Sequence, residues 1–305
     1  MSKNFSDLLS RVSACKKKTL SVAVAQDKAV LEAVKAAKEQ GIADAILVGD
    51  EAKIGEIAAE LGMDMKEYTV INEEDTVAAS LKAVQLVHDG KADMYMKGLL
   101  DTKTFLKSVL DKEVGLRTGK PLSHVCVFEI PGIDRLLFLT DVAFMPYPTL
   151  EDKVNIINYT VEVANACGVE MPKVAPLAAV EVVNPKMPVT VDAAELTKMN
   201  EEGKITGCIV DGPLSLDIAL YKEAAEEKGA LDRKVAGDAD ILLFPDIHAG
   251  NLVYKAIVHM VNVKNGNILT GTKAPVILTS RSDTCEVKVN SIALAALAAE
   301  TLKSE

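Results

Sequence analysis

Short, continuous apolar runs alternate with segments of helical periodicity along almost the whole chain, and this alternation limits the possible folds more than any other feature. The first example is LSVAVA at 20–25, which is followed by apolar residues at helical spacing over 27–40. Asp27 is the expected N-cap of that helix, and Gly41 is its expected stop. Strands that are apolar throughout are typical of parallel sheets covered on both faces. The pattern therefore predicts an α/β fold.

The same alternation predicts elements along the rest of the chain. Further strands are expected at 45–49, 68–72, 92–96, 174–180, 207–210, 239–244 and 274–279. Further helices are expected at 51–61, 73–88, 101–111, 150–167, 192–202, 216–227, 251–263 and 286–302. The runs 123–130 and 136–140 are separated by Pro131-Gly132-Ile133-Asp134, which predicts an antiparallel hairpin. At 305 residues, two domains are expected, and the hairpin marks the change between them.

Composition and charge exclude several classes of function. The net charge is −10 and only 4% of the residues are aromatic, whereas nucleic-acid binders need basic surfaces and stacking rings. No run approaches the ~20 apolar residues of a membrane span, and no signal peptide is expected. The five cysteines are scattered without a CxxC motif, which argues against a zinc site or a disulfide scaffold. We therefore expect a cytoplasmic protein that binds no metal, nucleic acid or membrane.

Polar residues directly after the strands are the candidate ligand-binding groups, because ligands of α/β sheets bind beyond the carboxyl ends of strands. After the run 274–278 come Thr279, Ser280, Arg281, Ser282, Asp283 and Thr284, followed by a helix. Three hydroxyls, an arginine and the amides of a helix start could bind phosphate. The alternative is an N-cap cluster beside a surface arginine, with Ser282, Asp283 or Thr284 as the cap.

Two other strand ends carry similar groups. Asp246, His248, Gly250 and Asn251 follow the strand at 239–244, and Lys97, Gly98 and Thr102 follow the strand at 92–96. Lys97 could bind phosphate, and Gly250 could admit a ligand close to the backbone. The alternatives are a solvated Lys97, a solvated His248, and Asn251 as a helix cap. The chain has no GxGxxG after a strand, no GxxxxGK[ST] and no GxSxG.

Taken together, these segments resemble the phosphate acetyl/butyryltransferase family, and most closely its butyryl branch. ADILLFPDIHAGNLVYK at 239–255 is similar to the family's F-P-D-x-x-x-G-N-x-x-Y-K segment. DGPLSLDIAL at 211–220, TDVAFM at 140–145, PTL at 148–150 and the triplet Thr279-Ser280-Arg281 also fit, and the match spans essentially the whole chain. The resemblance identifies the chain as a member of this family.

The resemblance implies a fold and a domain division. It implies two α/β/α sandwich domains of the isocitrate/isopropylmalate dehydrogenase-like type, with a cleft between them. The first domain would be discontinuous and comprise residues 1–125 and 271–305, and the second would comprise 126–270. A homodimer or larger homo-oligomer is implied as well.

The resemblance also implies a reaction, the reversible transfer of a short acyl group, butyryl, between CoA and orthophosphate. Both substrates would bind together, with CoA as a substrate, no permanently bound cofactor and no metal. Ser280 would donate to the developing negative charge, and Arg281 would hold phosphate or CoA. Lys97, Gly98, Thr102, Asp246, His248, Gly250, Asn251 and Thr279 would contribute to phosphate or CoA binding.

The resemblance does not identify the general base. The family's acetyl branch has an aspartate seven residues after the serine, and this chain has Val287 at that position. Asp283 is favoured for that role and Glu286 is second. Ser282 and His248 stand where the acetyl branch has glycine and asparagine, which favours the butyryl branch.

Other functions stay open at this point. A transferase of different acyl length is the first alternative. A hydroxyacid dehydrogenase that uses NAD(P) and a metal, and a non-catalytic module that binds acyl-CoA, are the others. The shared fold alone does not separate them.

Overall fold

The structure, a computed structural model, describes residues 2–280 and 283–301 and divides into two compact units. We call residues 5–120 and 265–301 the N-terminal unit, and residues 2–4 and 121–264 the central unit. Each unit is described by itself. The domain boundaries predicted at 125/126 and 270/271 stay a prediction, because compactness does not demonstrate independent folding.

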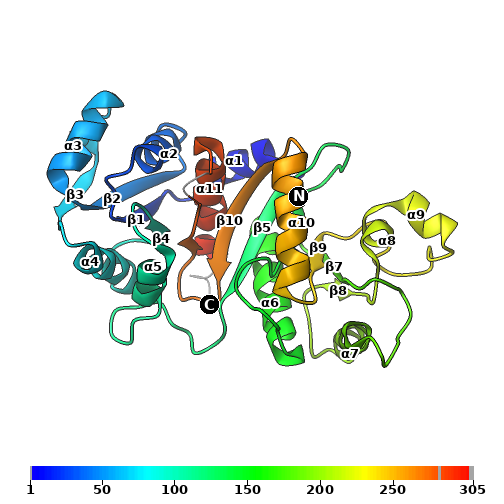
Figure 1. Cartoon of the computed structure of the whole chain (residues 1–305). Coiled ribbons are helices and arrows are strands. Elements are labelled where there is room, and N and C mark those ends of the chain that lie inside the picture. Colours follow the sequence, from blue (N-terminus) through cyan, green and yellow to red (C-terminus); the bar gives the residue numbers. More distant parts are fainter. Residues whose placement is uncertain (1, 281–282, 302–305) are drawn as a thin grey trace. The chain divides into compact units, whose positions relative to one another are not determined.

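A parallel sheet forms the centre of the N-terminal unit (Figure 1). Its strands lie in the order β3-β2-β1-β4-β11-β10, and all neighbours are parallel except β10 and β11. Ala23 lies opposite Lys97, and Met96 lies opposite Ile277, so the carboxyl ends of β1, β4 and β11 meet at one edge. The strands are β1 (Lys18–Ala23), β2 (Ala43–Gly49), β3 (Thr69–Asn72), β4 (Met94–Lys97), β10 (Lys264–Thr270) and β11 (Val276–Ile277).

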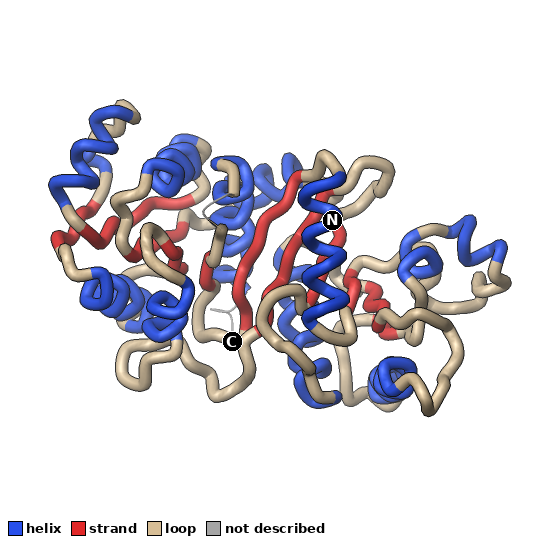
Figure 2. The backbone as a smooth tube through the Cα atoms, in the orientation of Figure 1, coloured by secondary structure: helices blue, strands red, loops and turns tan. Residues whose placement is uncertain are grey.

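Helices cover this sheet in two groups, with α11 packed against α1 and α2, and α4 packed against α5. Figures 1 and 2 show the two groups on opposite faces of the sheet, as the alternation in the sequence predicts. The helices are α1 (Phe5–Ser13), α2 (Lys28–Glu39), α3 (Glu51–Glu60), α4 (Thr76–His88), α5 (Thr102–Val109) and α11 (Cys285–Thr301), with a 3-10 turn η1 (Met65–Glu67). Every residue of α11 from Lys288 to Ala299 is buried, so this helix belongs to the core on all sides.

Strand β10 is not predicted by the sequence, because its residues, KNGNILT, begin with polar side chains. Asn265 and Asn267 are nonetheless buried in it. Helix α11 bonds to the backbone of both residues: the side-chain amide of Asn290 donates to the Asn265 backbone carbonyl at 3.2 Å, and the Ser291 hydroxyl accepts from the Asn267 backbone amide at 2.9 Å. Helix α11 thus completes part of the backbone hydrogen bonding of this strand.

The central unit contains the hairpin that the sequence predicts, with β5 antiparallel to β6 and Cys126 opposite Leu139. The order is β5-β6-β9-β7-β8, and the pairs after the hairpin are parallel. The strands are β5 (Ser123–Glu129), β6 (Leu137–Thr140), β7 (Lys173–Pro176), β8 (Ile209–Val210) and β9 (Ile241–Leu243). The helices are α6 (Leu150–Ala166), α7 (Pro188–Glu201), α8 (Leu216–Leu220), α9 (Lys222–Glu227) and α10 (Ile247–Met260).

Besides β10, the structure differs from the sequence interpretation at helix α1 and in the bounds of three predicted helices. Helix α1 was not predicted, although its three buried apolar residues lie on one face. Helix α7 begins at Pro188 rather than at 192, since proline suits the first turn of a helix. The predicted helix at 216–227 is two helices, which are separated at the extended residue Tyr221. The third predicted helix that differs is α10, which belongs to the candidate site and is described in that subsection.

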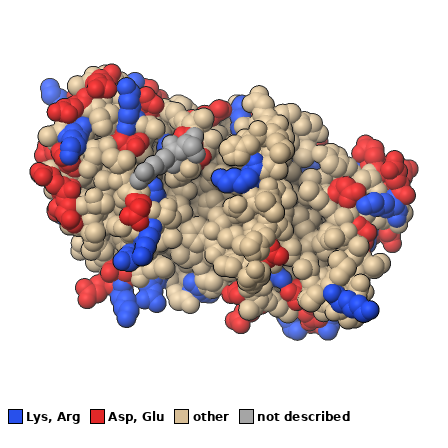
Figure 3. All heavy atoms as spheres, in the orientation of Figure 1, with Lys and Arg blue, Asp and Glu red and all other residues tan. Residues whose placement is uncertain are grey.

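Charged side chains of both signs are mixed on the surface, with acidic groups gathered over α3 and α9 (Figure 3). The surface over α10 carries few charges in the same view. Among the described residues, no helix is both long and apolar enough to span a membrane.

Helix α11 offers a test of the fold. Leu294 of α11 has no exposed surface, so Leu294→Ala leaves a cavity and is expected to lower the free energy of unfolding by about 2–5 kcal/mol. Leu110→Ala at a position that is 43% exposed is the matched control and should cost clearly less. Chemical denaturation measures both, and equal losses would show that α11 is not part of the core.

Candidate functional site

A small polar pocket lies at the carboxyl ends of β4 and β11 in the N-terminal unit. It contains four of the residues that the sequence singles out, Lys97, Gly98, Thr279 and Ser280. Asp27, Val30 and Lys288 complete the lining. Its volume of about 10 Å³ is enough for one water molecule, or for one oxygen of a phosphate group.

Two buried lysines make this pocket suitable for an anion. Lys97 is 6% exposed, and its Nζ donates to the Gly98 carbonyl at 3.4 Å. Lys288 is 2% exposed, and its Nζ donates to the carbonyls of Ser280, at 3.4 Å, and Asp283. No ion pair of Lys288 is found within the described part of the chain. The Lys288 ammonium group is bonded to neutral carbonyls, which favours an anion in the pocket, because burial of a charge without a counter-charge is costly. The Asp27 carboxylate lines the same pocket.

Lys288 is a residue that the sequence interpretation missed. The signal for it is a lysine flanked by valines, VKV, in a helix whose other residues are mostly apolar or small. A lysine in such a helix is either at the exposed edge or, as here, directed to a polar pocket.

Only glycine fits at position 98, because the backbone at Val24 leaves no room for a Cβ. A Cβ at this position would lie 2.3 Å from the Val24 carbonyl oxygen. The Gly98 amide donates to the Ala23 carbonyl at 2.9 Å, and the Leu99 amide donates to the Val24 carbonyl at 2.8 Å. Val24 has a φ of 54°, a left-handed conformation that is rare for a β-branched residue. The end of β1 and the turn after β4 are therefore held against each other beside the pocket.

The loop before α11 holds the proposed catalytic groups. The Asp283 carboxylate accepts from the Ser280 amide at 2.7 Å, and the Asp283 amide donates to the Ser280 carbonyl at 3.2 Å. The Thr284 hydroxyl accepts from the Val287 amide at 3.3 Å, so Thr284 acts as the cap of α11. Glu286 is exposed in the first turn of the helix. Arg281 and Ser282 lie outside the described residues.

Thr102 does not line this pocket. It is the exposed first residue of α5, and Asp101 caps that helix by accepting from the Thr104 amide at 2.9 Å. Its predicted part in binding stays a prediction.

The second group of predicted residues lies at the start of α10 in the central unit. The predicted start of this helix at Asn251, and the cap role of that residue, are wrong. The helix begins at Ile247, because the Asp246 carboxylate accepts from the amides of His248, at 2.9 Å, and Ala249, at 3.0 Å. Asn251 instead donates through its side-chain amide to the Val142 carbonyl at 3.0 Å.

Gly250 lets this first turn pack against the segment after β6. A Cβ at Gly250 would lie 2.3 Å from the Asp141 carbonyl oxygen, so the close approach is to the chain's own backbone. The Asp141 carboxylate accepts from the amides of Ala143 and Phe144, at 2.7 and 2.8 Å, and thereby shapes the segment that α10 contacts. The interpretation that Gly250 admits a ligand finds no support in this contact.

The side chain of His248 is exposed at this turn. Its Nε2 lies 3.0 Å from the hydroxyl of Tyr147, and the two rings are tilted with centroids 5.6 Å apart. Tyr147 is 74% exposed, and the sequence interpretation missed it. Its signal is a lone aromatic residue between two prolines, PYP, in a chain with few aromatic residues.

The buried residue His124 contacts the same segment through Asp141. The His124 amide donates to the Asp141 carboxylate at 3.2 Å, and the ring lies 3.4 Å from the Cys126 sulfur. Burial lowers the pKa of the His124 imidazole, although the Asp141 carboxylate opposes this effect. Within the described ranges, no group of three His, Cys, Asp or Glu side chains has the arrangement of a metal site.

Comparison with known proteins identifies the class. The model of the phosphate acetyl/butaryl transferase family matches residues 4–80 and 73–296. The chain therefore belongs to this family, and the resemblance noted in the sequence is confirmed.

Individual relatives cover the chain almost completely. The chain is 59% identical to the phosphate butyryltransferase of Clostridium acetobutylicum, over 98% of this chain and 99% of the relative. It is 57% identical to the phosphate butyryltransferase of Clostridium beijerinckii over the same shares. A crystal structure of a branched-chain phosphotransacylase from Enterococcus faecalis has a TM-score of 0.81 at 35% identity, over 92% of this chain and 99% of that one.

The predicted fold class is also confirmed. Besides the phosphotransacylase, a 4-hydroxythreonine-4-phosphate dehydrogenase from Burkholderia phymatum matches with a TM-score of 0.54 at 12% identity, over 93% of this chain and 99% of that one. At this identity the likeness concerns the fold alone, and it agrees with the dehydrogenase-like α/β type.

The glycine of α10 gives a test of the close contact at this turn. Gly250→Ala is expected to lower the free energy of unfolding by at least about 1 kcal/mol, because the new methyl group overlaps the Asp141 carbonyl. Gly55→Ala is the matched control within a helix, since a Cβ there meets nothing within 4 Å. That change should stabilise by about 0.5–1 kcal/mol. Thermal or urea unfolding compares them, and stabilisation by both would contradict the contact.

Proposed function

We propose that this chain catalyses the reversible transfer of a butyryl group between CoA and orthophosphate, as a phosphate butyryltransferase. The observation that carries the proposal is the 59% identity to the Clostridium acetobutylicum enzyme over almost the full length of both chains. The substrates are small molecules, with CoA as a substrate rather than a resident cofactor. The absence of a bound cofactor, the homo-oligomer and the cytoplasmic location stay predictions.

The reaction requires charge stabilisation at one carbonyl. In the forward direction, a phosphate oxygen attacks the thioester carbonyl carbon and the carbon–sulfur bond breaks, so CoA leaves as a thiolate that takes up a proton. In the reverse direction, the CoA thiolate attacks the acyl phosphate and the carbon–oxygen bond to phosphate breaks. Both directions pass through a tetrahedral oxyanion, which preorganised hydrogen-bond donors stabilise. Binding of both substrates together contributes by proximity.

The pocket of the N-terminal unit supplies groups of the required kind. In this proposal Lys97 and Lys288 hold an oxygen of phosphate, and the Ser280 hydroxyl, at the exposed rim, donates to the oxyanion. Thr279 and Gly98 line the same pocket. The role of Arg281 in holding phosphate or CoA comes from the family resemblance alone.

Asp283 is the better candidate for the general base. Its carboxylate is held by the Ser280 amide, so it stays close to the proposed oxyanion donor. Glu286 is exposed and lies one turn into α11. In the central unit, the exposed His248 and Tyr147 are the groups that we propose for contact with CoA or phosphate. Asp246, Gly250 and Asn251 shape the turn that presents them.

The direct test is a free-thiol assay with butyryl-CoA and phosphate. We expect release of CoA that depends on phosphate, together with formation of butyryl phosphate. The acetyl alternative predicts a higher kcat/KM for acetyl-CoA than for butyryl-CoA. If acetyl-, propionyl-, butyryl- and valeryl-CoA all fail to release CoA in the presence of phosphate, the proposed function is wrong. Reduction of a nicotinamide cofactor by a hydroxyacid would support the dehydrogenase alternative.

The role of Lys97 is tested separately. Lys97→Met should raise the KM for phosphate by about 10- to 100-fold, the range expected for loss of one hydrogen bond to a charged group. Lys91→Met is the control, because Lys91 is exposed six residues earlier. Steady-state kinetics with each substrate varied in turn distinguishes the sites. An increase in the KM for butyryl-CoA alone would place CoA, rather than phosphate, at Lys97.

A further inference from the structure

The central unit contains a large apolar cavity that none of the groups discussed above occupies. Its volume is about 450 Å³, within the range of roughly 300–1,000 Å³ that is common for small-molecule sites. It lies at the carboxyl ends of β7 and β9, between the starts of α7 and α8 and the first half of α10. The lining residues are Leu177, Ala178, Ala179, Met187, Val189, Leu216, Phe244, Pro245, Ala249 and Val253.

The lining determines what kind of ligand the cavity can accept. Every one of these side chains is aliphatic, aromatic, proline or methionine, and none carries a charge or a hydrogen-bonding group other than the methionine sulfur. A phosphate or a ribose would lose its hydration there without replacement. A hydrocarbon chain would instead gain by leaving water.

The position of the cavity connects it to the candidate substrate-binding turn. Pro245 directly precedes the cap Asp246, and Ala249 follows His248 in the first turn of α10. A ligand whose polar part contacts that turn therefore has an apolar space beside it. This is the arrangement that an acyl group attached to a polar carrier requires.

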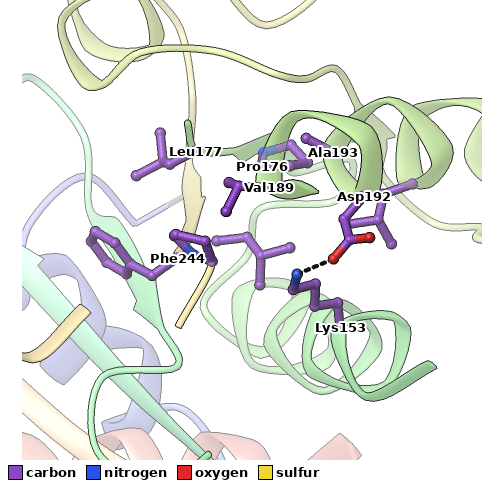
Figure 4. Close-up of a pocket in the computed structure, with 10 residues that line it drawn as sticks. Lys153, Pro176, Leu177, Val189, Asp192, Ala193 and Phe244 are labelled. Atoms are coloured by element: carbon purple, nitrogen blue, oxygen red, sulfur yellow. Dashed lines mark hydrogen bonds and ion pairs between the residues drawn. The ribbon is translucent and has the colours of Figure 1, made fainter. Parts of the chain in front are cut away.

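An ion pair between α6 and α7 lies at a small space next to the cavity (Figure 4). Lys153 of α6 is 5% exposed, and its Nζ lies 2.5 Å from the Asp192 carboxylate of α7. Figure 4 shows this pair on one side of a small space and Leu177 and Phe244 on the other, with Val189 between them; these three residues also line the cavity. The pair joins α6 to the beginning of α7, the helix that contributes Val189 to the cavity wall.

We propose that this cavity binds the hydrocarbon chain of the acyl group, and that Val253 and Leu216 on two of its walls determine which chain lengths are preferred. The proposal rests on the proposed function and adds the place where the acyl group is recognised. The cavity is several times larger than a four-carbon chain needs, so a butyryl chain fits in full, and the apolar lining favours it over the shorter acetyl group. Each buried methylene should raise kcat/KM about fourfold from acetyl- to butyryl-CoA.

The experiment compares matched variants on one helix. Val253→Asp places a carboxylate in the apolar lining and is expected to lower the ratio of kcat/KM for butyryl-CoA to that for acetyl-CoA about tenfold, because the two extra methylenes no longer leave water for an apolar surface. Leu252→Asp is the control, because Leu252 is the neighbouring residue on α10, is 72% exposed and does not line the cavity. The control should leave the ratio unchanged. Leu216→Asp, on the wall formed by α8, should lower the ratio as Val253→Asp does and covers the case in which one variant fails to fold.

The outcomes separate this proposal from its competitors. An equal loss with both acyl-CoA substrates would show that the cavity holds the part common to them, the pantetheine arm, and would overturn the proposal. An unchanged ratio with a shifted elution volume in size-exclusion chromatography would also overturn it, by showing that a second copy of the chain covers this surface. If the unmodified protein transfers no acyl group, the proposed function itself fails. If it is active and the folded variants keep its ratio, only the acyl cavity is wrong.

Discussion

Parallel pairing of β1, β4 and β11 is the constraint on which the polar pocket depends. In parallel strands the carboxyl ends fall at one edge of the sheet, and the register places Lys97 and the residues after Ile277 at that edge. Residues that are far apart in the sequence thus meet at one edge of the sheet. Gly98 packs closely against the end of β1, and this contact fixes the backbone position of the neighbouring Lys97 at the pocket.

The sequence predicts those parts of the fold that a local pattern determines. The apolar runs of β1, β4 and β9, the helix at 28–39 with its cap Asp27, and the hairpin of β5 and β6 all follow from periodicity and turn residues. Strand β10 could not be predicted this way. Its backbone bonds to Asn290 and Ser291 of a helix that comes later in the chain, and a pattern of neighbouring residues does not reveal such partners.

The candidate site shows the same division. Lys97 and Ser280 were found because they lie at the ends of predicted strands, and a strand end is visible in the sequence. Lys288 was missed because it reaches the pocket from inside a buried helix, where only the tertiary packing gives a lysine its direction. Gly250 and Asn251 were identified as positions of interest, but their observed contacts are with the backbone at Asp141 and Val142. A motif can therefore be specific for a family while part of it serves to shape a turn.

The order in which the N-terminal unit receives its strands has a consequence for synthesis of the chain. Strand β4 has β11 as its neighbour, but β11 and the core helix α11 lie within the last forty residues. While the ribosome makes residues 121–264, the edge of β4 and the apolar faces that α11 will cover have no partner from their own unit. Open edges of this kind favour association with other chains. The nascent protein thus passes through a long interval in which protection by chaperones would matter most for the part of the chain that was made first.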